Sequence, residues 1–246
     1  MDVFSIQYFL VILPEINRSE MGKDKIRRFN ENKTFENVVQ PTREEAVNNF
    51  PLKGNWNKDF FKNDNPIVLE LGCGKGEYTV AMARREADRN FIGIDIKGAR
   101  FWRGAKTALE EGLDNVGFMR TQIELIDKVF AENEVSEIWI TFPDPQIKFR
   151  RTVHRLTNPD FLARYNKILK PEGTVNLKTD SEFLHGYTHG MIQLLGHKVI
   201  KSSHNVYHPD NRELPKIVTE VQTYYEEKFK ALGKTITYIQ FQFKED

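Results

Sequence analysis

Apolar residues along this chain recur in short runs, and longer stretches with an apolar helical face lie between them. The short runs predict strands at 67–71, 91–94, 116–119, 138–142, 174–177, 198–202 and 235–243. The amphipathic stretches predict helices at 77–85, 97–111, 160–169 and 181–195. This alternation predicts an α/β fold with a mainly parallel, seven-stranded sheet and helices on both faces. Ligands then bind outside the carboxyl ends of the strands.

The chain before the first predicted strand has a different character. Residues 24–65 are polar and rich in lysine, with breakers at Pro41, Pro51 and Gly54. The sequence therefore predicts an apolar N-terminal extension at 1–20, a polar N-terminal arm at 21–65 and the main domain at 66–246. The extension is too short to span a bilayer and has no cleavage signature, so we expect neither membrane insertion nor export.

A glycine-rich turn joins the first predicted strand to the first predicted helix. Gly72, Gly74 and Gly76 let the chain reverse sharply and let its backbone approach a ligand closely. The spacing is G-x-G-x-G. A dinucleotide fingerprint has the spacing G-x-G-x-x-G and would place its third glycine at position 77, where this chain has Glu77. This pattern favours S-adenosylmethionine over a nicotinamide dinucleotide.

Two carboxylates flank this turn. Glu70 lies at the end of the first strand, and Asp95 follows the second strand roughly 20 residues after the last glycine, where a ribose-binding carboxylate is expected. A different interpretation is open, in which Glu70 is only a strand-end residue and Asp95 caps the helix that begins near Lys97.

The loop after the fourth predicted strand is the best candidate for carrying chemistry. Pro143 and Pro145 hold Asp144 between them on a stiff backbone at the ligand edge of the sheet. A basic stretch follows and predicts a phosphate-binding patch, with Lys148, Arg150, Arg151, His154 and Arg155. The alternative is an ordinary turn followed by a solvated charge run.

Composition limits these hypotheses. Lys and Arg total 36 against 35 for Asp and Glu, so contact with a nucleic acid has to come from a local patch and not from overall charge. The single cysteine, Cys73, excludes an intramolecular disulfide and gives no zinc cluster, which fits a cytoplasmic protein without a metal site. Its place in the glycine turn indicates a packing role more than a nucleophile.

Taken in order along the chain, these motifs resemble those of the bacterial tRNA (guanine-N7-)-methyltransferases. The resemblance runs from about Lys25 to the C-terminus and is carried by L-E-L-G-C-G-K-G at 69–76, G-I-D at 93–95, F-P-D-P at 142–145, K-T-D at 178–180 and T-Y-Y-E-E-K-F at 223–229. It implies a Rossmann-like class I methyltransferase fold. It also implies transfer of the methyl group of S-adenosylmethionine to guanine 46 in the tRNA variable loop, by a monomer or homodimer with no obligatory protein partner.

The resemblance also implies roles for individual residues. Cofactor contacts fall to the turn glycines and to Glu70, Asp95, Gln122 and Asp144, and Asp144 is also the active-site acid. Contacts to the RNA substrate fall to Lys148, Asp180, Thr223, Tyr224, Tyr225 and Glu226. The arginines of the basic loop are further candidates for phosphate contacts, namely Arg150, Arg151 and Arg155.

The sequence departs from the family pattern at two places. Gln122 replaces an acidic residue, although its carbonyl oxygen still suits an adenine amino group. The basic loop reads Q-I-K-F-R-R where the family has W-P-K-K-R-H.

Several alternatives stay open. Thr223 and Glu226 have the spacing of a capping box, and Asp180 could be the N-cap of the next helix. In favour of a substrate role, the Glu226 carboxylate could accept paired hydrogen bonds from guanine N1–H and the 2-amino group. The competing functions are methylation of a different RNA or a small molecule, a non-catalytic tRNA-binding module and, disfavoured by the glycine spacing, a dehydrogenase.

Overall fold

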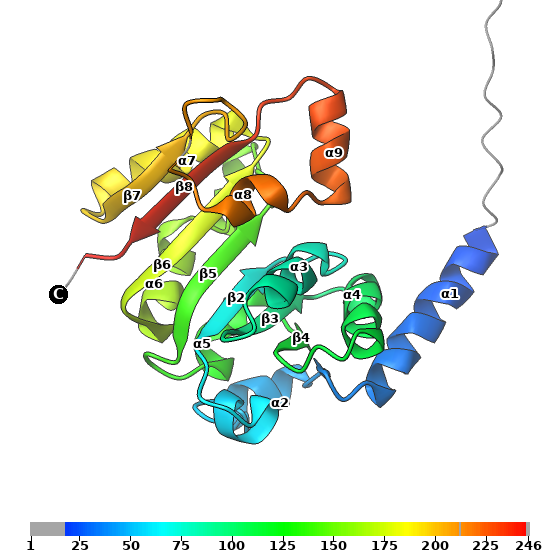
Figure 1. Ribbon diagram of the computed structural model, residues 1–246. Helices are drawn as coiled ribbons and strands as arrows, with labels where there is room; N and C mark the ends of the chain where they lie inside the picture. Colours follow the sequence, from blue (N-terminus) through cyan, green and yellow to red (C-terminus); the bar gives the residue numbers. More distant parts are fainter. Residues whose placement is uncertain (1–17, 212, 245–246) are drawn as a thin grey trace, which may run out of the picture.

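The computed structural model describes residues 18–211 and 213–244, and its centre is one eight-stranded sheet flanked by helices (Figure 1). The strand order across the sheet is β1-β4-β3-β2-β5-β6-β8-β7. The strands are β1 (Val38–Val39), β2 (Ile67–Leu71), β3 (Asn90–Asp95), β4 (Val116–Arg120), β5 (Val135–Thr141), β6 (Leu169–Thr179), β7 (Lys198–Ser203) and β8 (Thr237–Gln242). All seven predicted strands are present.

The strand directions define where a ligand binds. Strands β1 to β6 are mutually parallel, whereas β8 runs antiparallel to both β6 and β7. From β2 the chain builds β3 and β4 on one side, then crosses back to place β5 and β6 on the other. The order therefore reverses between β2 and β5, and open α/β sheets bind ligands at the carboxyl ends of their strands at such a point.

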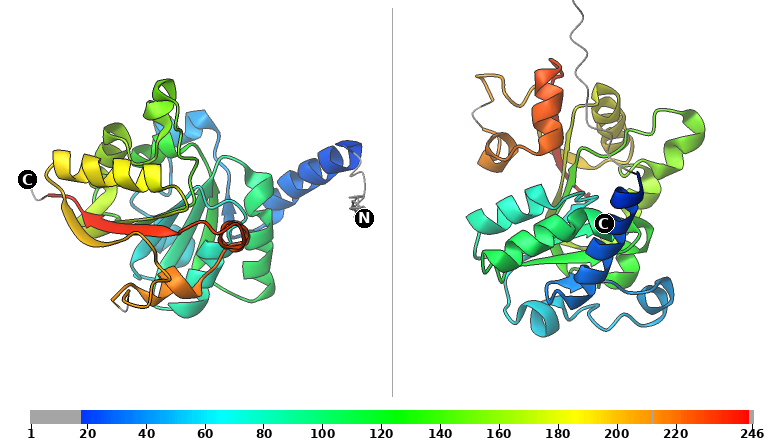
Figure 2. Two further views of the ribbon diagram at one scale, coloured as in Figure 1. Left: turned by 90° about the horizontal axis from the view of Figure 1, so that it is seen from above. Right: turned by 90° about the vertical axis from the view of Figure 1, so that its right-hand side faces the viewer.

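Two hydrophobic cores cover the two faces of the sheet. Alternate side chains of a strand point to opposite faces, so Leu69 and Leu71 of β2 enter one core and Val68 enters the other. The first core packs beneath α5, α6 and α7, and the second beneath α3, α4 and α8. Figure 2 shows helices on both sides of the sheet.

The helices begin and end as local capping chemistry favours. Thr42 and Glu45 form a reciprocal capping box at the start of α2, and Asn158 caps α6 with Pro159 as its first residue. The α-helices are α1 (Arg18–Glu31), α2 (Arg43–Asn48), α3 (Glu77–Arg85), α4 (Gly98–Glu110), α5 (Ile126–Val129), α6 (Pro159–Ile168), α7 (Glu182–Leu194), α8 (Lys216–Glu220) and α9 (Tyr224–Ala231).

The segment before β2 contributes to the core and adds a strand that the sequence analysis did not predict. Val38 and Val39 pair with β4, which makes the sheet eight-stranded and not seven-stranded. A π-helix, Trp56–Phe61, buries Trp56 against Phe130. Helix α1 extends outward (Figure 1) and contacts α4 where the Trp102 indole donates to Glu31 at 2.7 Å. Residues 1–17 of the predicted apolar extension lie outside the described residues.

Within the described part of the chain, no helix has both the length and the apolar character that a membrane span requires.

Candidate functional site

The glycine turn between β2 and α3 has the geometry of a ligand cradle. Gly72, Gly74 and Gly76 adopt φ angles of +77°, +58° and +76°, a region that disfavours other residues. A Cβ atom added to Gly72 or Gly74 would meet nothing within 4 Å, whereas one on Gly76 would lie 2.5 Å from the Phe118 ring. The first two glycines therefore border open space, and the third packs tightly against the protein.

A hollow of about 300 Å³ opens in front of this turn at the carboxyl ends of β3 and β4. Gly72, Asp95 and Gln122 line it together, and their contact with a cofactor stays a prediction. His154 and Phe161 close its other side. The volume is at the lower end of the range of small-molecule pockets and suits a nucleoside-sized group.

Asp95 is buried at the rim of this hollow. One carboxylate oxygen accepts from Gly74 N at 3.1 Å and the other from Lys97 N at 2.7 Å. Lys97, not Asp95, occupies the N-cap position of α4. Because a carboxylate accepts more than one bond per oxygen, Asp95 retains acceptor capacity for ribose hydroxyls. Across the hollow, Gln122 Oε1 accepts from the Arg43 guanidinium.

Glu70 lies behind the turn. Its side chain is fully buried, and it accepts from Thr79 N at 2.9 Å, from the Thr79 hydroxyl and from Thr141 Oγ1 at 2.5 Å. Burial raises the pKa of Glu70 to about 7, and these three donors oppose the rise. Glu70 thus ties β2 to α3 and β5 from behind, and its direct contact with a cofactor stays a prediction.

The described residues fit S-adenosylmethionine. Gly72 leaves its backbone open toward the hollow, Asp95 offers carboxylate oxygens to ribose hydroxyls, and Gln122 offers an amide to an adenine ring. The acidic surroundings also suit the positive charge of a sulfonium.

A second hollow, of about 550 Å³, lies beside the strand ends of β5 and β6 and contains Asp144. The Asp144 carboxylate is exposed and accepts from Gln146 N at 3.1 Å. Phe142 and Gln146, on either side, adopt φ angles of +48° and +47°, which are costly for non-glycine residues. Backbone strain that brackets a presented carboxylate is typical of functional sites.

Asp180 enters the same hollow. Its carboxylate accepts from Lys234 Nζ at 2.6 Å. Asp180 is not the N-cap of α7, because Ser181 holds that position and accepts from Leu184 N at 3.2 Å. Tyr225 also lines the hollow, so three predicted site residues meet there.

Glu226 requires a correction. Thr223 caps α9 as predicted and accepts from Glu226 N at 3.3 Å, but the Glu226 side chain does not complete the capping box. Instead Glu226 is fully buried and accepts from Lys178 Nζ at 2.7 Å and from Tyr207 Oη at 2.6 Å. Because the Glu226 side chain has no exposed surface, its carboxylate does not face a guanine in this arrangement. Glu226 anchors α9 to strand β6.

The basic loop is only partly available to phosphates. Lys148, Arg150 and Arg151 are exposed, as a phosphate patch requires. The prediction for Arg155 is wrong for this arrangement, because Arg155 is buried and donates to the carbonyl oxygens of Gln146 and Ile147. Its role here is to hold the loop.

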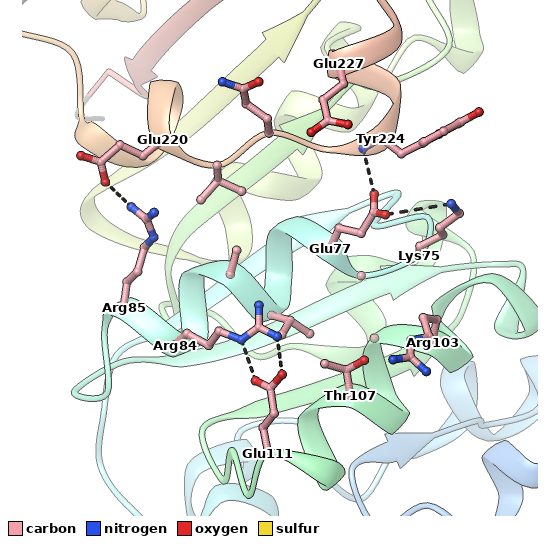
Figure 3. Close-up of a pocket in the computed structure, with 16 residues that line it drawn as sticks. Lys75, Glu77, Arg84, Arg85, Arg103, Thr107, Glu111, Glu220, Tyr224 and Glu227 are labelled. Carbon is pink, nitrogen blue, oxygen red and sulfur yellow. Dashed lines mark hydrogen bonds and ion pairs between the residues drawn. The ribbon is translucent and has the colours of Figure 1, made fainter.

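A further hollow, of about 780 Å³, lies elsewhere, between helices α3 and α4 and the α8–α9 segment (Figure 3). Arg84 pairs with Glu111 at 2.5 Å, and Arg85 pairs with Glu220. Tyr224 N donates to Glu77 at 3.3 Å, which joins α9 to the start of α3. Acidic and basic side chains alternate across this hollow, so it does not resemble a phosphate site.

Sequence reasoning missed three contributors to the site. Lys178 and Tyr207 fix Glu226 from within the core, and Arg100 of α4 lines the Asp144 hollow. Lys178 carried a signal, since a lysine in a buried strand requires a partner. Arg100 and Tyr207 carried none, because their roles depend on tertiary contacts.

Comparisons with known proteins agree with this geometry. The family model described as putative methyltransferase matches residues 64–239. A tRNA (guanine-N(7)-)-methyltransferase from Christiangramia forsetii is 66% identical over 91% of this chain and 99% of its own length. One from Porphyromonas gingivalis is 50% identical over 85% of each chain.

Solved structures support the fold. The 16S rRNA methyltransferase KamB has a TM-score of 0.56 at 13% identity, covering 74% of this chain and 89% of its own. A 16S rRNA (adenine(1408)-N(1))-methyltransferase from Catenulisporales acidiphilia, solved with its cosubstrate SAM, has a TM-score of 0.51 at 13% identity, covering 75% and 88%. These two show the fold alone. The identity to the curated relatives shows that this chain belongs to the tRNA (guanine-N7-)-methyltransferase family.

Proposed function

We propose that this protein transfers the methyl group of S-adenosylmethionine to N7 of a guanine in tRNA. The observation that carries the proposal is the pairing of two hollows at one edge of the sheet: the first holds Gly72, Asp95 and Gln122, and the second presents Asp144. The close relatives carry the same activity in their names. Guanine 46 of the variable loop is the target we expect, and a tRNA substrate favours the cytoplasm.

Cofactor binding falls to the first hollow. When bound, S-adenosylmethionine supplies an electrophilic methyl group on a sulfonium. Asp95 would hold the ribose, Gln122 would face the adenine, and the open backbone at Gly72 and Gly74 would accept close approach. Thr79 and Thr141 fix Glu70 and so keep the turn in this shape before any ligand arrives.

The chain contributes to catalysis mainly by positioning the guanine base against the methyl donor. Guanine N7 has an available lone pair and no proton at neutral pH, so the reaction needs no general base. The second hollow has aromatic walls from Phe142, Tyr225 and Phe229 that suit a purine ring. Asp144, held by its strained loop, would accept a hydrogen bond from the base and stabilise the positive charge that develops on it.

Charge complementarity supplies the remaining contacts. Lys148, Arg150 and Arg151 lie on the loop that follows Asp144 and are exposed to an approaching phosphate backbone. Since the target base is part of a folded tRNA, it has to leave its stack before it reaches Asp144. We expect a monomer or homodimer to be sufficient for this reaction, with no obligatory protein partner.

The decisive experiment uses labelled S-adenosylmethionine and unmodified tRNA, with the labelled nucleoside identified by mass spectrometry. We expect 7-methylguanosine from the wild-type protein. The Asp144→Asn variant should lose roughly 100-fold or more in kcat while binding tRNA and cofactor normally, because it removes charge stabilisation without removing volume. Asp114→Asn, which alters a carboxylate outside both hollows and before β4, is the matched control.

Other outcomes would identify the competing functions. Label in a different nucleoside would mean that the protein methylates another base. Methyl transfer without RNA would indicate a small-molecule methyltransferase, and tRNA retention without label would indicate a binding module. Full turnover by Asp144→Asn would remove Asp144 from the mechanism.

A further inference from the structure

The loop after Asp144 displays an aromatic side chain that the reaction described above does not use. Phe149 is 92% exposed, the highest value among the large apolar residues of the described chain. Its neighbours Ile147 and Val153 are 68% and 62% exposed. An apolar patch held in water on one loop generally marks an interaction surface.

The loop is built to keep this patch outside. The buried Arg155 guanidinium donates to Gln146 O at 3.1 Å and 3.2 Å, and it lies 4.4 Å from the centre of the Tyr187 ring. Asn158 donates to Val153 O at 2.6 Å. These bonds hold the backbone at both ends of the short helix Phe149–His154, so the loop carries the Phe149 ring at the surface before any partner binds. The exposed ring is therefore preorganised.

The surroundings of the ring identify the partner. Lys148, Arg150 and Arg151 flank Phe149 and are exposed, so the patch interleaves an aromatic ring with cations. Ile147, two residues away, lines the same hollow as Asp144. A ring surrounded by positive charge at the rim of a base-sized hollow fits an unpaired nucleotide, because its base stacks on the ring while its phosphates meet the cations.

We propose that Phe149 stacks on an unpaired base of the bound tRNA, next to the guanine that enters the Asp144 hollow. The inference rests on the proposed function. It identifies Phe149 as a substrate-binding residue that acts through its aromatic face, distinct from the phosphate contacts of its basic neighbours.

A fluorescence experiment tests the stacking directly. The three natural tryptophans, Trp56, Trp102 and Trp139, are buried, so the Phe149→Trp variant would carry one exposed indole. We expect unmodified tRNA to quench this emission, because stacked bases quench indole. A fully paired RNA duplex of similar length, which binds by charge alone, should leave it nearly unchanged.

Affinity measurements separate stacking from general hydrophobic contact. Phe149→Ala should weaken tRNA binding roughly 5- to 150-fold, the range given by alanine substitution at stacked bases. Phe149→Leu should be nearly as weak, whereas Phe149→Trp should bind as well as wild type. Leu194→Ala, which removes a side chain that is 74% exposed on α7, is the matched control and should have no effect.

The outcomes distinguish this inference from the proposed function. If wild type makes 7-methylguanosine but tRNA leaves the emission of the Phe149→Trp variant unchanged at saturation, stacking is overturned and the activity stands. Wild-type affinity for tRNA in Phe149→Ala overturns it as well, and a concurrent loss of self-association in sedimentation would assign the patch to a second copy of the chain. If wild type makes no 7-methylguanosine, the proposed function fails, whatever the fluorescence shows.

Discussion

Lys178 and Glu226 form an ion pair with both side chains fully buried. Such a pair seldom makes a protein more stable than apolar residues at the same positions would, but its geometry is specific. Loss of one partner leaves an unpaired charge in the core. Burial lowers the pKa of Lys178, and the nearby Glu226 carboxylate opposes that shift. Sequence motifs assigned Glu226 to the substrate. The ion pair explains how Glu226 can instead fix the position of Tyr224 and Tyr225 on α9.

Removing one member of this pair should destabilise the protein strongly. Lys178→Met leaves the Glu226 carboxylate with Tyr207 alone, and we expect the free energy of unfolding to fall by about 3–5 kcal/mol in urea denaturation. The double variant Lys178→Met/Glu226→Leu should recover most of that loss. Lys228→Met, on the exposed side of α9, is the control. A single variant as stable as this control would contradict the buried pair.

Glu70 should make stability depend on pH. Its pKa of about 7 in the folded protein lies above the ordinary value of 4.5, so the folded state binds more protons between these two pH values. The free energy of unfolding therefore falls as pH rises from about 4.5 to 7, by roughly 3 kcal/mol for a shift of this size.

The Glu70→Gln variant tests this linkage. Because glutamine does not titrate, its stability relative to wild type should rise between pH 5 and pH 8 when both are unfolded in urea without cofactor. A difference that stays constant over this range would mean that Glu70 is ionised throughout in the folded protein.

At the scale of elements, helix α4 packs directly on the glycine turn. A Cβ atom on Gly104 would lie 2.7 Å from Lys75 O and 3.0 Å from Gly76 Cα, and backbone atoms cannot rotate away. Gly104→Ala should therefore push α4 from the turn, cost about 1–3 kcal/mol in stability and weaken cofactor binding measured by calorimetry.

A second helical glycine provides the control. Gly186 lies in α7, and a Cβ atom there would meet nothing within 4 Å. Gly186→Ala should raise stability by up to about 1 kcal/mol through helix propensity, with cofactor affinity unchanged. Equal effects of the two substitutions would show that α4 does not support the turn.

Most elements could be predicted from the sequence, and the misses have physical causes. Strand β2 and helix α3 have the predicted bounds because an uninterrupted apolar run meets glycines and then a helical pattern. Strand β6 begins at Leu169, before Pro171 and Gly173, which normally break strands, since its first residue pairs with Val135 of β5. The two-residue β1 has no periodicity of its own and exists only because β4 offers an edge.

At the scale of the whole molecule, a net charge of +1 cannot attract RNA, so affinity depends on where the cations lie. The Arg150→Ala/Arg151→Ala double variant should bind tRNA more weakly. It should also reduce the slope of log affinity against log salt by about 0.7 for each phosphate that the protein no longer neutralises. Lys198→Ala, exposed at the opposite end of the strands, should leave the slope unchanged. An unaltered slope in the double variant would argue against the patch.

The arrangement of the candidate site depends on the whole molecule, so it could be predicted only in part from the sequence. Residues that follow strands, such as Asp95, Gln122 and Asp144, could be predicted because parallel topology brings strand ends together. The division into two hollows and the burial of Arg155 and Glu226 could not, since they depend on tertiary packing, including the return of the chain after β7.

That return has a simple form. Helices α8 and α9 belong to a single excursion that leaves β7 and re-enters at β8, two neighbouring strands, and Val206 N donates to Ile236 O at 2.9 Å where the excursion closes. Because the two ends of this segment meet, a change in its length alone would leave the strand order unaltered. Two contacts back to the rest of the fold, the buried Lys178–Glu226 pair and the Tyr224 N–Glu77 bond, limit which residues on the α9 side of the substrate hollow can change.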